Sequence, residues 1–258
     1  MIDITVSSNA KCKYVRSLQQ KKGRSEHGEY TIEGIKSVRD AINSGTQVSA
    51  IYVSQSFYAH ETFAYPENVP LYRVADGVFD GLCDTKAPQG ILAVMKMGRD
   101  VFTPDITKAY IYCDSINDPG NLGTIIRTAD AAGFGGVMLS PECVDLYNPK
   151  TVRSSMGSFF NMKVMRSATP DMLVSYKASG FSIYGGALTD ESIDYRSADF
   201  TKPHIIVIGN EANGISDEVM KICTPVKIPI LGSAESLNAG VAAAILMYEA
   251  VRQRDKKA

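Results

Sequence analysis

Amide and guanidinium side chains gather at the start of an apolar run with helical spacing, in the segment NDPGNLGTIIR (117–127). Pro119 fixes the turn, and Asn121 falls where the first backbone N–H groups of a helix have no partner. Arg127 lies two turns later, where helical side chains lean back toward the N-terminus, so its guanidinium could reach this turn. Such a turn can hold a phosphate or a ribose. The plainer interpretation is a capping Asn121 and an Arg127–Asp130 pair on a solvated face.

Two further loops carry polar side chains that could serve the same site. Glu211 lies in IGNEANGIS (208–216), and both Ser236 and Asn238 lie in IPILGSAESLN (228–238). Each of the three also fits an ordinary turn or cap, so none of them establishes a site alone. Ligands collect outside the carboxyl ends of the strands in an open α/β sheet, and all three loops follow strand patterns. We therefore expect them to form one site.

The elements that must position these loops follow from hydrophobic periodicity. From residue 109 onward, short apolar runs separated by helical segments predict a mostly parallel sheet. The strand patterns are 109–113, 135–140, 181–188 and 204–210, and the helical patterns are 121–133 and 237–252. We expect one apolar face of the last helix to pack on the sheet. That face comprises Leu237, Val241, Ile245, Tyr248 and Val251.

The first hundred residues alternate helical and strand patterns, which predicts a smaller α/β layer. The predicted helices are 14–20 and 35–42, and the predicted strands are 30–32, 48–53, 69–74 and 91–95. The segment MGRDVFTPDITKA then supplies Gly, Pro and charge without periodicity, which is typical of a domain boundary. We therefore predict domains at 1–98 and 109–258, joined by a linker over 99–108.

Composition and charge limit the classes of function. The formal net charge of −1 does not favour coating nucleic acid by bulk electrostatics, although a local basic patch stays open. The five cysteines are never spaced as CxxC and the three histidines lie far apart, so we expect neither a disulfide framework nor a metal site. No apolar run approaches membrane-spanning length, and the first residues lack the apolar core of a signal peptide. We expect a cytoplasmic protein with no membrane partner.

The three loops occur in the order and with the spacings of the SpoU, or TrmH-like, branch of the SPOUT RNA methyltransferases. The segment DPGNLGTIIRTADAAG (118–133) resembles the first motif of that family, and GNEANGIS (209–216) resembles the second. IPILGSAESLNAGVA (228–242) is similar to the third, and VRSSMGSFF (152–160) is similar to an intermediate segment.

The likeness to this family spans nearly all of the chain. LQQKKGRSEHGEYTIEGIKSVRDAI (18–42) resembles part of the family's appended RNA-binding domain. One departure lies in the third motif, where Ala239 and Gly240 stand in place of the Val and Ser that are common in the family.

The resemblance implies a trefoil-knotted parallel-sheet SPOUT domain with a smaller N-terminal α/β RNA-binding domain. It also implies that the knotted loops bind S-adenosyl-L-methionine largely through backbone groups, which agrees with their glycines. By position, the implied cofactor-binding residues are Leu188, Gly209, Ile228, Leu237 and Asn238. The implied catalytic residues for methyl transfer to a ribose 2′-hydroxyl are Asn121, Arg127, Glu211, Ser236 and Asn238.

Arg127 corresponds to the arginine that the family is proposed to use in catalysis. An arginine stays protonated at neutral pH, which makes it a poor base. We expect it to hold the adjacent phosphate and to stabilise developing negative charge. The other polar residues of the three loops would order Arg127, the ribose and the cofactor.

A basic segment in the first domain is the predicted contact with RNA. Between residues 11 and 24 there are six basic side chains and no acidic one. A solvated helix face is the ordinary explanation of such a run, but the resemblance favours RNA binding. The predicted RNA-binding residues are Lys11, Lys13, Arg16, Lys21, Lys22 and Arg24.

The predicted substrate is ribosomal RNA, because the appended domain resembles that of the ribosomal RNA members of the family. The alternatives are a transfer RNA methyltransferase and a non-catalytic RNA-binding homologue. A dinucleotide-dependent oxidoreductase would need a GxGxxG segment after the first strand of a βαβ unit, which this sequence lacks. The resemblance further implies a homodimer in which helices of the knotted region pack together.

Overall fold

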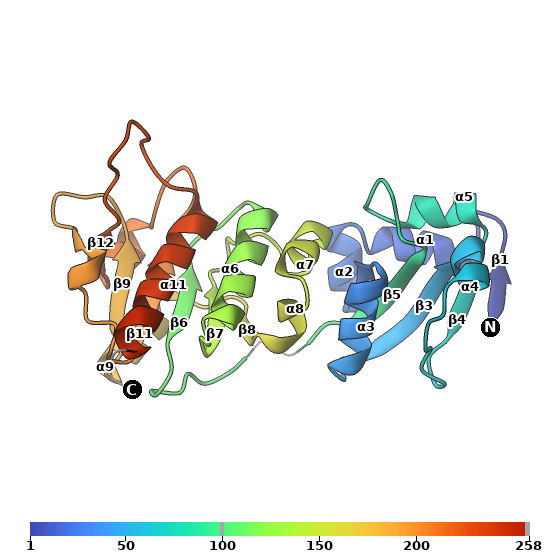
Figure 1. Cartoon of the computed structure of the whole chain (residues 1–258), viewed down its shortest axis with the longest axis horizontal. Coiled ribbons are helices and arrows are strands. Elements are labelled where there is room, and N and C mark those ends of the chain that lie inside the picture. Colours follow the sequence, from blue (N-terminus) through green and yellow to red (C-terminus); the bar gives the residue numbers. More distant parts are fainter. Residues whose placement is uncertain (99–100, 256–258) are drawn as a thin grey trace. The chain divides into compact units, whose positions relative to one another are not determined.

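The computed structural model describes residues 1–98 and 101–255, so Arg99 and Asp100 of the predicted linker lie outside the described residues. Contacts divide the chain into two compact units, drawn with their elements in Figure 1. The first unit contains Met1–Arg99 and Tyr147–Phe160, and the second contains Asp100–Leu146 and Asn161–Ala258.

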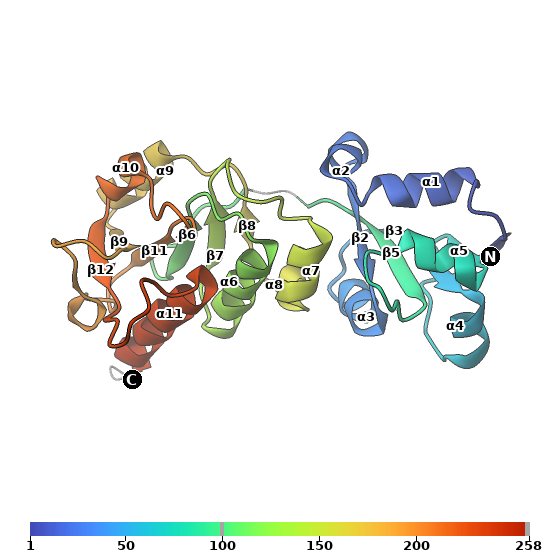
Figure 2. The same ribbon diagram turned by 90° about the horizontal axis from the view of Figure 1, so that it is seen from above.

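The first unit is a mixed five-stranded sheet with helices on both faces. Its elements are β1 (Ile2–Ile4), α1 (Ala10–Ser17), α2 (Lys21–His27), β2 (Glu29–Glu33), α3 (Ile35–Asn43), β3 (Val48–Ser54), α4 (Gln55–His60), β4 (Leu71–Val74), α5 (Asp76–Phe79), the 3-10 helix η1 (Asp80–Leu82), β5 (Ile91–Lys96), α7 (Pro149–Ser155) and α8 (Ser158–Asn161). The strand order is β1-β4-β3-β5-β2, in which β5 runs antiparallel to both of its neighbours. Figure 2 shows α1 along one face of this sheet and α3 and α4 along the opposite face.

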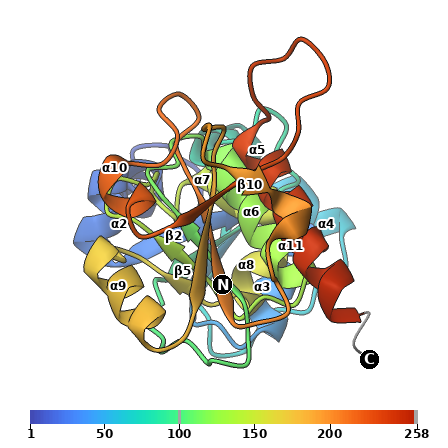
Figure 3. The same ribbon diagram turned by 90° about the vertical axis from the view of Figure 1, so that its left-hand side faces the viewer.

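The second unit is a seven-stranded sheet in which every pair of neighbouring strands is parallel, as predicted. Its elements are β6 (Tyr110–Cys113), α6 (Pro119–Ala131), β7 (Gly136–Leu139), β8 (Val164–Met165), α9 (Pro170–Ala178), β9 (Ser182–Gly186), β10 (Ile193–Asp194), the 3-10 helix η2 (Tyr195–Ser197), β11 (His204–Ile208), α10 (Asp217–Met220), β12 (Thr224–Lys227) and α11 (Ala239–Asp255). The strand order is β10-β12-β9-β11-β6-β7-β8. Figures 2 and 3 show α6 and α11 on one face of the sheet and α9 and α10 on the other.

The predicted helix over 14–20 is wrong in its bounds, because the structure has two helices there. Asn9 starts α1 early, since its side chain accepts a hydrogen bond from the Lys11 backbone N–H at 2.8 Å. The chain then turns sharply after Ser17, and a Cβ on Gly23 would lie 2.1 Å from the Ser17 carbonyl oxygen. Glycine at this position lets α2 approach the end of α1 closely.

The core-facing side of α11 also differs from the predicted one. Val241 and Tyr248 are 47% and 51% exposed, and Leu237 is exposed just before the helix. Small residues dominate the buried face, which comprises Ala239, Gly240, Ala243, Leu246, Met247, Glu249 and Ala250. They let α11 pack closely on α6, since a Cβ on Gly240 would lie only 3.2 Å from the Thr124 methyl carbon. The close approach of the α11 and α6 backbones therefore determines which face of α11 is buried.

Candidate active site

The turn that begins α6 is held by an aspartate. Asp118 is the N-cap residue, because its Oδ1 accepts a hydrogen bond from the Asn121 backbone N–H at 2.8 Å. Pro119 occupies the first helical position, where its missing N–H costs nothing. The interpretation of Asn121 as a simple helix cap is therefore wrong. Its buried side chain points instead to the other two loops.

Asn121 joins the three loops in one hydrogen-bonded row. Its Nδ2 donates to Glu211 Oε1 at 2.7 Å, and its Oδ1 accepts from Asn238 Nδ2 at 2.8 Å. One residue from each of the three motifs thus meets at the carboxyl end of the sheet. Asn121 is buried, and a buried amide without partners costs free energy, so its two hydrogen bonds hold the exposed side chains of Glu211 and Asn238 on either side of it.

Glu211 also fastens its loop to the turn before α6. Its carboxylate accepts hydrogen bonds from the backbone N–H groups of Asn117 at 3.2 Å and Asp118 at 3.3 Å. Burial raises the pKa of Glu211, but the hydrogen bonds from Asn121 and from the backbone together outweigh burial and hold the pKa below its usual value. Glu211 is therefore an ionised acceptor at neutral pH.

Asn238 caps α11 while it contacts Asn121. Its Oδ1 accepts hydrogen bonds from the backbone N–H groups of Gly240 at 2.9 Å and Val241 at 3.2 Å. The side chain thus fixes where α11 begins and faces the first motif at the same time. Ser236, which the sequence also allows as a cap, is exposed and lies in the loop before this cap.

A pocket with a volume of about 790 Å³ lies among the loops that follow β9, β11 and β12. This volume is within the range of small-molecule sites. The five predicted cofactor-binding residues line this pocket, and so do three of the predicted catalytic residues, since Asn238 belongs to both sets. These lining residues are Leu188, Gly209, Ile228, Leu237 and Asn238, together with Glu211 and Ser236. Figures 1 and 3 show the loop between β12 and α11 projecting beyond the sheet at this end.

Only glycine fits at position 209. A Cβ there would lie 2.2 Å from the Gly214 carbonyl carbon and 2.3 Å from the Ile215 nitrogen. The loop closes on itself at this point, since Asn210 and Gly214 exchange two backbone hydrogen bonds of 2.8 and 2.9 Å. The second motif therefore presents backbone groups to the pocket without an intervening side chain, as its glycines predict.

Two residues that hold this loop were not predicted. Asp114 is buried at the end of β6, and its Oδ2 accepts a hydrogen bond from the Ser216 backbone N–H at 2.7 Å. Asn210 Nδ2 donates to the Ser115 carbonyl at 2.7 Å, while its Oδ1 accepts from two N–H groups of its own loop. The signal for Asp114 was an acid directly after an apolar strand pattern, where a buried carboxylate needs a donor. Asn210 gave no signal beyond its place in a turn.

Arg127 lies on the exposed side of α6, two turns from Asn121. Among residues 1–98 and 101–255 it has no hydrogen bond or ion pair, so the alternative pairing with Asp130 is not formed. The guanidinium is therefore solvated and available to an anion. Neither Arg127 nor Asn121 is among the residues that line the pocket.

The predicted basic surface contains both exposed lysines and anchored arginines. The exposed lysines lie on α1 and α2 and are Lys11, Lys13, Lys21 and Lys22. Arg16 is half-buried, and its guanidinium donates to the carbonyl oxygens of Ser7 and Cys12. Unlike the Arg16 guanidinium, the ammonium groups of these four lysines do not donate hydrogen bonds to the backbone of α1 or α2, so they are accessible to phosphate groups.

Among the six predicted RNA-binding residues, only Arg24 is buried. It is 2% exposed, and its Nη1 donates to the carbonyl oxygens of Leu18 at 2.9 Å and Gln19 at 2.8 Å. These carbonyls end α1 and have no partner within that helix. The prediction that Arg24 contacts RNA is corrected accordingly, since its guanidinium closes the turn between α1 and α2.

Within the described residues, no three His, Cys, Asp or Glu side chains gather in a way that could hold a metal ion. In the same part of the chain, no helix has both the length and the apolar character needed to cross a bilayer.

Comparison with known proteins extends the picture given by the geometry. Residues 108–248 match the model of the SpoU rRNA Methylase family, and residues 9–93 match the MRM3-like substrate binding domain. The chain is 34% identical over 249 residues to a 23S rRNA (guanosine(2553)-2′-O)-methyltransferase of Bacillus subtilis, covering 96% of this chain and 98% of that protein. It is also 34% identical to a 23S rRNA (uridine(2479)-2′-O)-methyltransferase of Streptomyces viridochromogenes, covering 90% of this chain and 85% of that protein.

Solved structures show the same architecture over the whole chain. An AdoMet-bound rRNA methyltransferase from Sinorhizobium meliloti superimposes with a TM-score of 0.86 at 33% identity, covering 97% of both chains. The SpoU methyltransferase AviRb from Streptomyces viridochromogenes, in complex with the cofactor AdoMet, gives a TM-score of 0.84 at 30% identity, covering 96% of this chain and 98% of that one. The predicted SPOUT fold class and the resemblance are confirmed. The chain belongs to the SpoU rRNA methylase family.

Proposed function

We propose that the protein is an S-adenosylmethionine-dependent methyltransferase that modifies a ribose 2′-hydroxyl in ribosomal RNA. The observation that carries this proposal is the row of Asn238, Asn121 and Glu211, which ties three motif loops together beside one pocket. Family membership, the AdoMet-bound structural neighbours and the activities named for the relatives support the same conclusion.

The residues of the pocket fit S-adenosylmethionine. Gly209 brings backbone groups to the pocket surface, where they can pair with the polar edge of an adenine or a ribose. Leu188, Ile228 and Leu237 supply apolar surface for the flat base. When bound, S-adenosylmethionine supplies a methyl group that its sulfonium already activates.

The chemical task left to the protein is to align and activate a weak nucleophile. A ribose hydroxyl must lose its proton as it attacks, and negative charge develops on its oxygen. The solvated Arg127 is suited to hold the neighbouring phosphate and to stabilise that charge. Asn121, Glu211 and Asn238 position the turn that begins α6, the helix that carries Arg127, and Ser236 lines the pocket.

We assign selection of the RNA to the first unit. This unit contains the match to the substrate binding domain, and its exposed lysines on α1 and α2 can neutralise phosphates. Ribosomal RNA is the favoured substrate, since two relatives that are 34% identical to this chain and cover 90% or more of it are named for 23S rRNA. We place the protein in the cytoplasm, where reducing conditions agree with its five free thiols.

We also propose that two copies of the chain associate through α11. Val241 and Tyr248 form an exposed apolar stripe on this helix, and Leu237 is exposed just before it. In a two-fold symmetric dimer, the same stripe of a second copy would pack against it and shield both from water. Sedimentation at assay concentration should give the mass of a dimer, and a fully active monomer would refute the proposal.

Methyl transfer to defined RNAs tests the proposed function. Purified protein and labelled S-adenosylmethionine are incubated with ribosomal RNA from cells that lack the gene, with ribosomal RNA from wild-type cells and with transfer RNA. We expect label only in the first RNA, on a ribose 2′-oxygen at one nucleotide. Label in transfer RNA alone would assign the other substrate, and no transfer to any RNA would leave a non-catalytic RNA-binding protein.

A further inference from the structure

One stretch of the methylase family match does not pack with the rest of that match. Residues 147–160 lie inside the matched region 108–248, yet their contacts place them in the first unit, with the substrate binding domain. This stretch contains α7 and most of α8 and coincides with the VRSSMGSFF segment. We call it the 147–160 segment. Its two ends continue directly into the second unit.

Aromatic packing docks the 147–160 segment on the sheet of the first unit. The Tyr30 ring on β2 lies 4.7 Å from the Tyr147 ring and 5.7 Å from the Phe159 ring, between centroids. The hydroxyl of Tyr147 accepts a hydrogen bond from the Gly98 backbone N–H at 3.1 Å. Val152 of α7 is buried as well. Burial of this apolar surface is sufficient to hold the segment in place.

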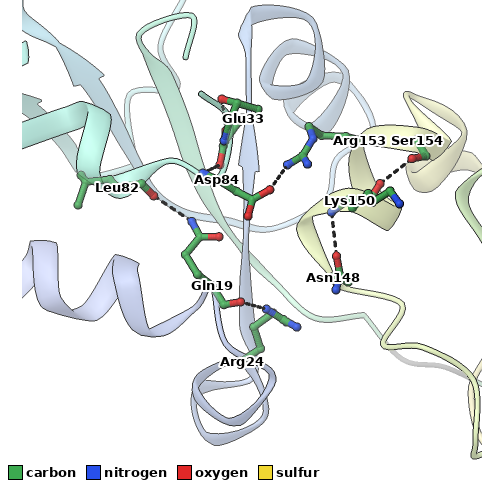
Figure 4. Close-up of polar contacts among 10 residues, drawn as sticks. Gln19, Arg24, Glu33, Leu82, Asp84, Asn148, Lys150, Arg153 and Ser154 are labelled. Carbon is green, nitrogen blue, oxygen red and sulfur yellow. Dashed lines mark hydrogen bonds and ion pairs between the residues drawn. The ribbon is translucent and has the colours of Figure 1, made fainter. Parts of the chain in front are cut away.

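An ion pair between α7 and the turn after η1 also orients the 147–160 segment. Arg153 Nη1 on α7 donates to Asp84 Oδ2 at 2.6 Å, and the two side chains are 36% and 42% exposed. Figure 4 shows Arg153 reaching across from α7 to Asp84. A pair this exposed contributes little to the free energy of folding. What it does fix is the rotation of α7 about its own axis, which apolar packing leaves less defined.

The turn that carries Asp84 is itself rigidly held. The Glu33 carboxylate accepts hydrogen bonds from the Asp84 backbone N–H at 2.6 Å and from the Thr85 N–H and hydroxyl at 3.2 and 2.7 Å. Gln19 Nε2 donates to the Leu82 carbonyl at 2.9 Å, which joins this turn to the end of α1 (Figure 4). Arg24 Nη1 in turn donates a hydrogen bond to the Gln19 carbonyl at 2.8 Å. An unbroken set of contacts therefore runs from the lysine-bearing helices to Arg153.

The chain immediately before the 147–160 segment leads to the first motif. Within the second unit, the Val144 backbone N–H donates to the Ile116 carbonyl at 2.8 Å. Ser140 Oγ accepts a hydrogen bond from the Ser115 backbone N–H at 3.0 Å. Residues 115 and 116 directly precede the turn that Glu211 and Asn121 hold. Residues 145–148 alone separate Val144, which is hydrogen-bonded to the chain just before the active-site turn, from Pro149 at the start of α7.

We propose that Asp84 and Arg153 are positioning residues for methyl transfer. Together they set α7 so that RNA held by the lysines of the first unit is presented to the turn of Asn121 in one orientation. This inference rests on the proposed function. It predicts a particular kinetic signature, because orientation acts on the fraction of bound RNA that reacts. The lysines, in contrast, determine the affinity of the protein for RNA.

Charge reversal of each partner tests the pair in the full-length protein. In Arg153→Glu and in Asp84→Arg, two like charges face each other, and we expect kcat to fall about threefold to tenfold. The dissociation constants for RNA and for S-adenosylmethionine should each stay within about twofold of wild type, and the melting temperature should change little. The exchange variant Asp84→Arg/Arg153→Asp restores the pair with opposite polarity, and most of the lost kcat should return.

A matched control separates this effect from a general change of charge. Arg73→Glu breaks another exposed Arg–Asp pair of the first unit, with Asp3, and should leave kcat unchanged. Loss of activity in Arg153→Glu alone, with weaker RNA binding, would make Arg153 a direct phosphate contact and overturn the proposal. Wild-type kcat in both single variants, or no recovery in the exchange variant, would overturn it as well. If wild-type protein itself transfers no methyl group, the proposed function fails first.

Discussion

The loops of the second unit and the basic helices of the first unit use polar residues in opposite ways. In the loops, Asn121, Glu211 and Asn238 bond to one another and to backbone groups, so the residues that define the motifs also build their own support. On α1 and α2, the lysines are exposed, and the residue that supports the helices is the buried Arg24.

This difference shows which kind of functional site can be recognised from residue types in the sequence alone. A site made of mutually bonded residues needs particular side chains at particular spacings, so its members appear together in a motif. A surface that acts through charge needs only cations on one face, and a cation that holds a turn looks the same in the sequence. The predictions below break or sharpen this contrast, from the largest expected effect to the smallest.

Removal of the Arg127 guanidinium should have the largest effect. We expect Arg127→Ala to lower kcat by about 10²- to 10³-fold, because the cation that stabilises the developing charge is lost. The affinity for S-adenosylmethionine without RNA should change by less than about threefold, since Arg127 does not line the pocket. Titration calorimetry and single-turnover methyl transfer measure the two quantities. Asp130→Ala, on the same helix, should be near wild type, and a large loss of cofactor affinity in Arg127→Ala would contradict the assignment.

A methyl group at position 209 should damage cofactor binding. In Gly209→Ala the new Cβ meets the backbone of Gly214 and Ile215, so the loop must move away from its present position. Overpacking of this kind costs about 1–3 kcal/mol, and we expect affinity for S-adenosylmethionine to fall about tenfold or more. Gly232→Ala is the control, because a Cβ there meets nothing within 4 Å. Equal affinity in the two variants would mean that the second motif does not shape the pocket.

Substitution of the exposed lysines should weaken RNA binding without slowing chemistry. Lys21→Ala/Lys22→Ala removes two cations, so the salt dependence of binding to single-stranded RNA should fall by about 1.4 in slope, at about 0.7 per phosphate contact. Turnover at saturating RNA should stay close to wild type. Fluorescence anisotropy at several salt concentrations gives the slope. An unchanged slope would mean that these lysines are only a solvated surface.

Arg24→Ala should instead act on stability, which separates it from its lysine neighbours. Two carbonyl groups at the end of α1 lose their donor, and a buried guanidinium leaves a gap. We expect the free energy of unfolding to fall by about 1–3 kcal/mol. Urea denaturation of the two variants should show this loss in Arg24→Ala and not in the lysine variant. The opposite pattern would restore Arg24 to the RNA-binding surface.

The smallest predicted effect is a loss of stability as the pH falls, and it should be confined to the second unit. His204 on β11 is buried, and burial lowers its pKa to about 4, against the opposing hydrogen bond with the Lys202 carbonyl. The unfolded chain therefore takes up a proton below about pH 6.5 that the folded chain takes up only near pH 4. The resulting loss of stability begins as the pH falls below about 6.5 and grows until about pH 4. Between pH 7 and pH 6 it amounts to less than about 1 kcal/mol.

Hydrogen exchange followed at pH 7 and pH 6 gives this loss separately for the amides of each unit. The amides of the first unit serve as the internal reference for this comparison. His204→Gln should abolish the pH dependence in the second unit. If the dependence persists in that variant, another group is responsible.

The sequence predicts the parallel sheet and the three motif loops well, because both depend on local pattern. Buried strands appear in the sequence as short apolar runs, and Gly209 directly follows such a run, where a backbone turn is needed. The strands β1, β8, β10 and β12 were not predicted, since two to four residues carry too little periodicity. Their existence depends on neighbouring strands that lie far away in the sequence.

Two other features could not be predicted because they depend on long-range packing. Periodicity assigns the largest apolar residues of α11 to the core, whereas Gly240 and the alanines beside it are buried so that α6 can come close. The 147–160 segment lies within one family match, and only its contacts with Tyr30 and Asp84 reveal that it packs with the first unit. Neither fact leaves a trace in local composition.

The place of β11 in the sheet has a consequence for synthesis of the protein. This strand pairs with β6 on one side and β9 on the other, at the centre of the second unit. A nascent chain that has emerged only as far as β8 can pair β6 with β7 alone, and the other edge of β6 stays open until His204–Ile208 leaves the ribosome. An open, apolar strand edge recruits other chains. Ribosome stalling before His204 should therefore yield fragments that aggregate more than fragments stalled after β11 has emerged, in which both edges of β6 are paired.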